Sequence, residues 1–96
     1  MPRFLLSPQA QNSLIQIGEY TLKNYGQQQK KKYLRMLRER MRLVAKNPEK
    51  GTERSDIKES YYSIRAEKHN IYYRVSDTHI EIIDLLHQSM EPKLHI

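Results

Sequence analysis

The chain has 96 residues, enough for one domain with a small core and too few for a second core. It carries a net charge of +6 and no cysteine, which excludes disulfide bonds and thiolate metal sites and fits a reducing compartment. No apolar run reaches membrane-spanning length, and the first residues lack the apolar core of a signal peptide, so we expect a cytoplasmic protein without a membrane partner.

The first elements are a short strand and a helix. Residues 3–6 favour a strand, and Ser7 follows as a helix N-cap with Pro8 at the first helical position. Apolar side chains at spacings of three and four mark one face of a helix that ends near Gly26, a residue suited to a C-terminal cap. Gly18, in the middle of this helix, would let a second helix approach closely.

A second helix is predicted from about Gln28 to Lys46, and it concentrates the positive charge. Residues 30–46 hold eight of the 17 lysines and arginines and one of the 11 acidic residues, a net charge of +7. At 100° per residue, a row of basic side chains lies about 120° away from an apolar stripe. The row is Lys31, Arg35, Arg38, Arg42 and Lys46, and the stripe is Leu34, Leu37, Met41 and Val44. Such a row attracts an acidic partner, either nucleic acid or protein; the alternative is a solvated helix face that keeps a small domain soluble.

Two further apolar residues of this helix, Met36 and Leu43, lie on neither surface. We interpret them as candidate contacts for a partner, with ordinary surface exposure as the alternative. The link between the two helices is short, which implies an antiparallel hairpin.

Three strands are predicted in the second half, after a breaker at residues 47–51. Residues 61–67 and 71–75 alternate between two faces, and the short turns after them are typical of an antiparallel meander. In the last strand, residues 80–87, isoleucines and leucines occupy both faces. This pattern indicates either a central strand covered on both sides or a bulge.

The order strand, two helices, three strands predicts a single α+β domain over residues 1–96. An antiparallel sheet is covered on one face by the helical hairpin, because neither element can bury its apolar side alone. A short C-terminal helix after the last strand is a further option. The opposite face of the sheet would then present Tyr61, Arg65, Tyr72 and Arg74.

The sequence offers no support for metal or nucleotide chemistry. The histidines at 69, 79, 87 and 95 lack partners at metal-ligating spacing, and no glycine-rich phosphate loop is present, so we expect no metal and no cofactor. Metal-free RNA cleavage stays open, with Arg65 and Arg74 as cations. The candidates for proton transfer are Tyr61, Tyr72, His69 and His87. The alternative is a structural role, as cross-strand pairs and a strand-end histidine.

Residues 88–96 form a polar tail that contains Met90, Leu94 and Ile96. The tail either packs back on the sheet or serves as a mobile, partner-binding terminus. Methionine suits an adaptable contact surface.

Several short segments follow one another in an order typical of one protein family. They are Leu6-Ser7 before an alanine-bearing helix, residues 17–20, Gly26, Tyr33-Leu34, residues 45–48 with Gly51 and Arg54, residues 69–74, and the closing block at residues 85–91. Through them the chain resembles the RelE/ParE superfamily of bacterial toxins over nearly its whole length, and the closing block is similar to the ParE branch. The departures are Asp84 where the family commonly has arginine, Glu91 in place of aspartate, and residues 60–63.

The resemblance implies the toxin of a type II toxin–antitoxin module of the plasmid-stabilisation kind. Such a toxin inhibits DNA gyrase by binding it, performs no catalysis of its own, is neutralised by a ParD-like antitoxin, and meets DNA only through the antitoxin complex. For gyrase binding we expect Arg74, His87, Met90, Lys93, Leu94 and His95. For antitoxin binding we expect Lys31, Arg35, Met36, Arg38, Arg42 and Leu43.

Two alternatives remain open beside gyrase inhibition. One is a RelE-type, ribosome-dependent mRNA endonuclease that acts through Arg65, Tyr72, Arg74 and His87. The other is an inactive toxin that is retained as a co-repressor.

Overall fold

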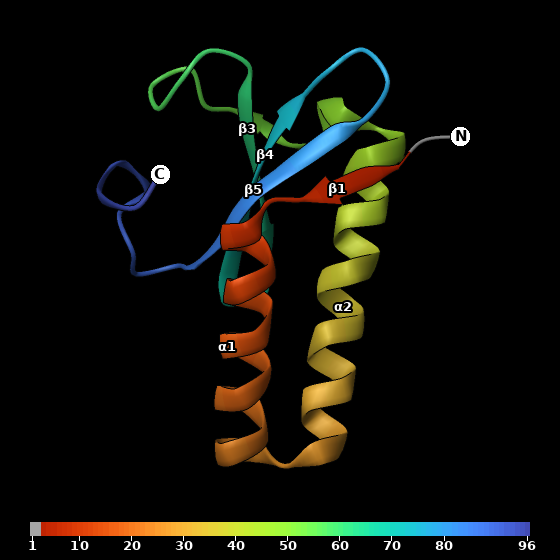
Figure 1. The fold of residues 1–96 in the computed structure, drawn as a ribbon, viewed down its shortest axis with the longest axis vertical. Coiled ribbons are helices and arrows are strands. Elements are labelled where there is room, and N and C mark those ends of the chain that lie inside the picture. The colour runs from red at the N-terminus through yellow and green to blue at the C-terminus, as the bar shows by residue number, and fades with distance from the viewer. Residues whose placement is uncertain (1–2) are drawn as a thin grey trace.

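The computed structural model describes residues 3–96, in which a hairpin of two helices packs against a five-stranded sheet (Figure 1). In chain order the elements are β1 (Phe4–Leu6), α1 (Pro8–Tyr25), α2 (Gln27–Lys46), β2 (Thr52–Glu53), β3 (Tyr61–Ala66), β4 (His69–Val75) and β5 (Ile80–His87). Short 3₁₀ helices lie at Pro48–Lys50 and Pro92–Leu94. The predicted α+β class is confirmed, and the second 3₁₀ helix is the short C-terminal helix.

The strand order across the sheet is β1-β5-β4-β3-β2. β3, β4 and β5 form the predicted antiparallel meander, and β2 adds a two-residue strand beside β3 that the sequence did not suggest. β1 departs from the antiparallel pattern because it pairs in parallel with β5, with Phe4 opposite Ile80 and Leu6 opposite Ile82. The sheet is therefore mixed, and its first and last strands lie side by side.

The last strand is both a central strand and a bulged one, which are the two explanations that the sequence left open for its ambiguous pattern. β5 lies between β1 and β4. Its register against β4 shifts, because Tyr72 lies opposite Asp84 while Tyr73 lies opposite Ile82. Ile83 is thus the extra residue of a β-bulge, which turns the apolar side chains after it to new faces.

Ser7 joins this bulge to the start of α1. Its hydroxyl donates to the Ile83 carbonyl at 2.6 Å and accepts the Ala10 N–H at 3.0 Å, as an N-cap does. Its own N–H donates to the Ile82 carbonyl at 3.0 Å. The predicted N-cap with Pro8 after it is confirmed.

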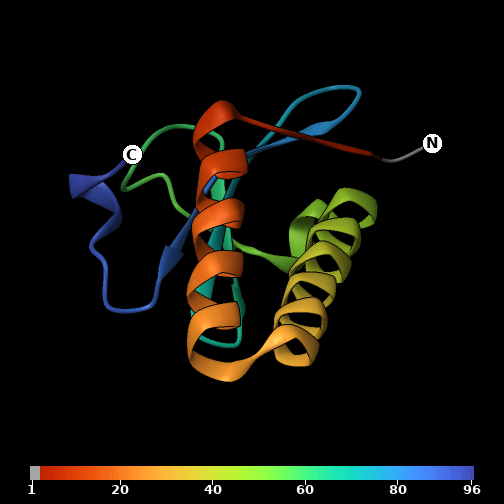
Figure 2. The same ribbon diagram turned by 60° about the horizontal axis from the view of Figure 1, so that its bottom comes forward.

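The two helices lie side by side (Figure 2), and they pack closely at a glycine, as predicted. A Cβ atom added to Gly18 would lie 3.2 Å from Lys30 Cε and 3.4 Å from Leu34 Cδ1. Gly26 alone links the helices, and its φ of 92° lies in the left-handed region that favours glycine.

The core lies between the hairpin and the sheet. The predicted stripe of α2 contributes Leu37, Met41 and Val44, which are buried. The other buried members of this core are Ala10, Ile17, Ala66, Ile71, Tyr73, Ile80, Ile82 and Leu85. Among residues 3–96, no helix has both the length and the apolar character needed to cross a membrane.

The opposite face of the sheet is not the open face that the strand alternation predicted. Tyr72 is 1% exposed and Tyr61 is also buried. Residues 54–59 cover this face: the Arg54 N–H donates to the Tyr61 carbonyl at 2.7 Å, and the Arg54 guanidinium carbon lies 5.8 Å from the centre of the Tyr72 ring. The prediction is wrong for both tyrosines because a loop after β2 folds back over them, while Arg65 and Arg74 remain exposed.

Candidate protein-interaction surfaces

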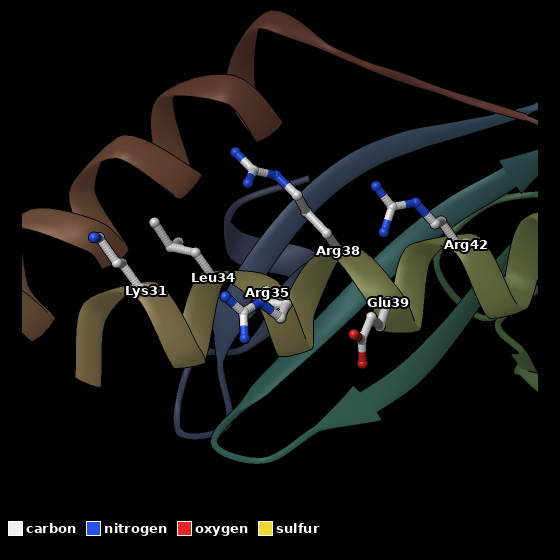
Figure 3. A pocket seen from close by; sticks show the side chains of 6 residues that line it. All are labelled: Lys31, Leu34, Arg35, Arg38, Glu39 and Arg42. Carbon is white, nitrogen blue, oxygen red and sulfur yellow. The ribbon is translucent and has the colours of Figure 1, made fainter. Parts of the chain in front are cut away.

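The first candidate surface is the basic row, defined as Lys31, Arg35, Arg38 and Arg42. All four side chains are exposed, and with Leu34 and Glu39 they line an open hollow of about 450 Å³ (Figure 3). In the part of the chain that the structure describes, no salt bridge involves a member of the row. The row, with Glu39 beside it, therefore presents a net positive charge along α2.

The basic row lies on the side of the hairpin that faces away from the sheet. On α2, buried Leu37 marks the sheet side and Leu34 marks the contact with α1, and the row continues around the helix beyond Leu34. On α1, Ile15 and Leu22 likewise lie past the helix contact at Gly18, on the side that is turned away from the sheet. They are 60% and 41% exposed. Ile15 and Leu22 thus form an apolar stripe on α1, and the seam where the two helices meet separates this stripe from the basic row on α2.

Sequence reasoning did not assign Ile15 and Leu22 to a partner surface. Their spacing of seven residues places both on one helix face, which was the available signal. Their exposure follows from packing, because α1 already buries Ala10 and Ile17 against the core and meets α2 at Gly18.

The structure separates Met36 and Leu43 from the basic row. Both lie about 120° around α2 from the row, by the 100° rotation per residue. Leu43 is exposed, whereas Met36 is half-buried and packs against the core. The six residues predicted to bind one partner therefore occupy two faces of the helix.

The second candidate surface is the tail surface, defined as Met90, Lys93, Leu94 and His95. All four are exposed, and Leu94 is 80% exposed. The tail is folded: the Glu91 carboxylate accepts the Lys93 N–H at 3.4 Å, and the Ile96 N–H donates to the Pro92 carbonyl at 2.8 Å. Pro92 is buried, so it anchors a turn that displays the apolar side chain of Leu94 to solvent.

Arg74 does not belong to the tail surface. Its guanidinium forms a salt bridge with Glu81 at 3.1 Å, near the start of β5, whereas His87 ends that strand. Glu81 and His87 are six residues apart, about 20 Å at the usual rise per strand residue. The predicted gyrase-binding set is thus divided between the two ends of the sheet.

The four residues of the RNA-cleavage alternative are likewise not gathered into one site. Arg65 lies opposite Asn70, and Arg74 lies opposite Tyr61 at the other end of the β3–β4 pair. Arg65 is bound to the Asn70 and Gln88 side chains at 2.9 and 2.8 Å. Tyr72, between these ends, is buried under the loop.

The third feature is a histidine cluster, formed by Tyr33 of α2, His69 of β4 and His87 of β5. His69 lies opposite His87, and the two rings meet edge to face with their centroids 5.6 Å apart. The Tyr33 hydroxyl lies 2.7 Å from His69 Nδ1. Burial, and then the nearby His87, lower the pKa of His69 to about 4, and burial raises the pKa of Tyr33. At neutral pH, His69 is therefore uncharged, and in the tautomer with its proton on Nε2 its Nδ1 accepts from the Tyr33 hydroxyl.

Asp84, the departure from the family pattern, has a clear structural role. It is buried, and its Oδ1 accepts the Ser13 hydroxyl at 2.6 Å and the Leu85 N–H at 2.8 Å. These bonds tie α1 to the end of β5 beyond the bulge. In residues 3–96, no cluster of three or more histidine, aspartate or glutamate side chains is arranged to hold a metal ion.

These features define a small basic α+β domain that presents the basic row and the tail surface openly to solvent. This form is suited to binding another macromolecule. Residues 4–92 match the family described as the ParE toxin of the type II toxin–antitoxin system, parDE. The chain belongs to this ParE toxin family. The resemblance to the ParE branch is thereby confirmed.

Individual proteins show the same relationship. The chain is 36% identical over 90 residues to Toxin ParE1 of Mycobacterium tuberculosis, which covers 93% of this chain and 92% of that protein. Its structure is similar to one from the chromosomal ParDE TA system of P. aeruginosa, with a TM-score of 0.77, 16% identity, and coverage of 91% and 96% of the two chains. It is also similar to a chain of the YoeB–YefM complex of Staphylococcus aureus, with a TM-score of 0.58, 24% identity, and coverage of 88% and 93%. At these identities the two structures show a shared fold alone.

Proposed function

We propose that this ParE-family toxin acts in the cytoplasm by binding DNA gyrase and blocking replication, and that the tail surface makes the contact. The observation that carries the proposal is the display of Leu94, which is 80% exposed on an anchored turn. An apolar side chain held out in this way is suited to insertion into a pocket on a partner. Met90, Lys93 and His95 beside it supply an adaptable and cationic rim.

We further propose that the basic row binds an acidic, ParD-like antitoxin, and that the toxin meets DNA only through that complex. A disordered acidic segment that folds on binding would be drawn to the basic row. Its apolar side chains would then cover Ile15 and Leu22 across the seam. Family membership supports this partner, and the solved relative in P. aeruginosa is part of a ParDE system.

The tail assignment is tested by placing a charge at the exposed anchor. Leu94→Asp should relieve the growth arrest caused by induced toxin, because a carboxylate in an apolar pocket is costly to bury. Ile15→Asp is the matched control, since it changes another exposed apolar residue, 60% exposed against 80% for Leu94, by the same charge on the other surface. The control should still arrest growth. Arrest by Leu94→Asp at the wild-type rate, at equal protein level, would contradict the tail assignment.

A further inference from the structure

The root of the tail, residues 88–90, is held by three backbone hydrogen bonds. The Gln88 N–H donates to the Lys68 carbonyl at 2.8 Å, the Ser89 N–H to His87 Nδ1 at 3.2 Å, and the Met90 N–H to the His87 carbonyl at 2.9 Å. The Ser89 hydroxyl also lies 2.8 Å from His87 Nδ1. The direction in which the tail leaves β5 therefore depends on His87 and on Lys68.

Both of these residues lead back to one hydroxyl group on α2. The Lys68 N–H donates to the Tyr33 oxygen at 3.3 Å, and the Tyr33 oxygen lies 2.7 Å from His69 Nδ1. His69 in turn meets the ring of His87 edge to face. Two routes thus run from Tyr33 to the root of the tail, one through Lys68 and one through the histidine pair.

We propose that Tyr33, His69 and His87 are positioning residues for the C-terminal tail, which they hold in one direction while His69 is neutral. The inference rests on the proposed function only in taking the tail as the target-binding segment.

The protonation state of His69 matters because its Nδ1 serves as an acceptor. In the tautomer that carries the ring proton on Nε2, Nδ1 accepts the Tyr33 hydroxyl proton, while the Tyr33 oxygen accepts the Lys68 N–H. A proton on Nδ1 would end the donation from Tyr33. His87 Nδ1 accepts the Ser89 N–H.

The surroundings of the cluster favour the neutral state of His69. The charged groups around it are Glu67 and Lys68 of the β3–β4 turn, and Arg65, which donates to the Gln88 side chain at 2.8 Å. Burial and His87 keep the pKa of His69 at about 4. Opening the root of the tail would return that pKa toward its ordinary value, so acid favours the open form.

The test is native-state hydrogen exchange on the isolated full-length protein, read at the amides of Gln88, Ser89 and Met90. Protection factors, which correct for the intrinsic pH dependence of exchange, are taken relative to the core amides of Ile71 and Tyr73. In the wild type, protection of the three tail amides should fall on the order of tenfold between pH 7 and pH 5, while the core amides stay protected.

Three variants separate the positioning role from a general structural one. Tyr33→Phe should reduce tail protection about tenfold at pH 7, the factor expected for the loss of a buried hydrogen bond. His69→Asn supplies an amide oxygen as a non-titrating acceptor, so it should keep tail protection at pH 7 and lose the step toward pH 5. His79→Asn, at the β4–β5 turn, should behave as the wild type.

Two results would overturn the inference: unchanged tail protection in Tyr33→Phe, or a full acid step in His69→Asn. Neither readout involves gyrase or growth, so such a result leaves the proposed function standing. In the converse case, the order of the tail depends on Tyr33 and His69 as predicted, but Leu94→Asp still arrests growth. That result would contradict the proposed function and leave the positioning role of these residues intact.

Discussion

His69 carries the clearest pH dependence of any single residue in this fold. Its pKa is about 4 in the folded protein, against 6.5 for an ordinary histidine, because it is buried against Tyr33 and beside His87. Between these two values the unfolded chain binds more protons than the folded one, so acid favours unfolding. The stabilisation is complete above about pH 6.5 and is lost as the pH falls toward 4.

We therefore expect the free energy of unfolding to fall by about 1 kcal/mol more between pH 7.5 and pH 5 in the wild type than in His69→Asn, since solvent screens a partly exposed ring. Urea denaturation at several pH values measures this difference. Equal losses in the two proteins would show that other groups set the acid sensitivity.

Gly51 leads to a second prediction about a single residue, which concerns the room available for a side chain at this position. A Cβ atom at this position would overlap the Tyr73 hydroxyl and lie 2.9 Å from the Ser63 carbonyl oxygen. That hydroxyl donates to the Pro48 carbonyl at 2.6 Å, and burial raises the pKa of Tyr73 to about 12. The tyrosine therefore has little freedom to move aside.

Gly51→Ala should cost about 1–3 kcal/mol of stability through overpacking. Thermal or urea unfolding measures the loss, and Tyr73→Phe serves as the partner in a double-mutant cycle. Because the hydroxyl that would overlap is absent, the double variant should lose less stability than the two single changes added together. If the two losses of stability add strictly, the cost of Gly51→Ala does not come from overlap with the Tyr73 hydroxyl.

At the scale of elements, local signals predicted the helices well. Ser7, Pro8 and Gly26 act through their immediate neighbours, so the bounds of α1 follow from the sequence. The parallel pairing of β1 with β5 could not be predicted, because residues 4–6 and 80–82 share no turn signal. Alternation in β3 and β4 shows which side chains share a face but not that residues 54–59 cover Tyr61 and Tyr72.

The candidate surfaces likewise include features that the sequence predicted and features that it could not predict. Helical periodicity was enough to place the basic row on one exposed face of α2. The histidine cluster could not be predicted, because Tyr33 and His69 are far apart in the chain and meet only through the packing of α2 on β4. The wide separation of Arg74 from His87 likewise depends on strand register rather than on sequence spacing.

The basic row yields a prediction about a whole helix face. Reversing Arg35, Arg38 and Arg42 to glutamate should slow antitoxin association by at least about tenfold at low salt, because long-range attraction sets the encounter rate. Stopped-flow mixing with the antitoxin at two ionic strengths measures it. Reversing Lys23, Lys50 and Lys58, which are equally exposed but off the row, changes the net charge by the same amount. If both triple variants associate equally slowly, net charge rather than the row is responsible.

In the whole molecule, the two surfaces lie on different sides. The basic row faces away from the sheet on the hairpin. The tail lies on the side of residues 54–59 (Figures 1 and 2), where Arg54 and, to a smaller extent, nearby Lys93 lower the pKa of the Asp56 carboxyl. A substitution on one surface therefore leaves the other surface unchanged, and mutations should separate antitoxin binding from growth arrest.

The fold by itself does not choose the target, since a chain of a YoeB–YefM complex shares it. The side chains carry more information. The four residues predicted for RNA cleavage, Arg65, Tyr72, Arg74 and His87, are spread along the sheet, and Tyr72 is covered. These four side chains therefore do not assemble one site for chemistry on RNA.

The most direct measurement adds the purified protein to DNA gyrase in a supercoiling and DNA-cleavage assay, and in parallel to mRNA in a translation extract. If the toxin acts on gyrase, supercoiling should stop and cleaved DNA should accumulate, Leu94→Asp should weaken both effects, and the mRNA should stay intact. Cut transcripts together with unaffected gyrase would contradict gyrase as the target.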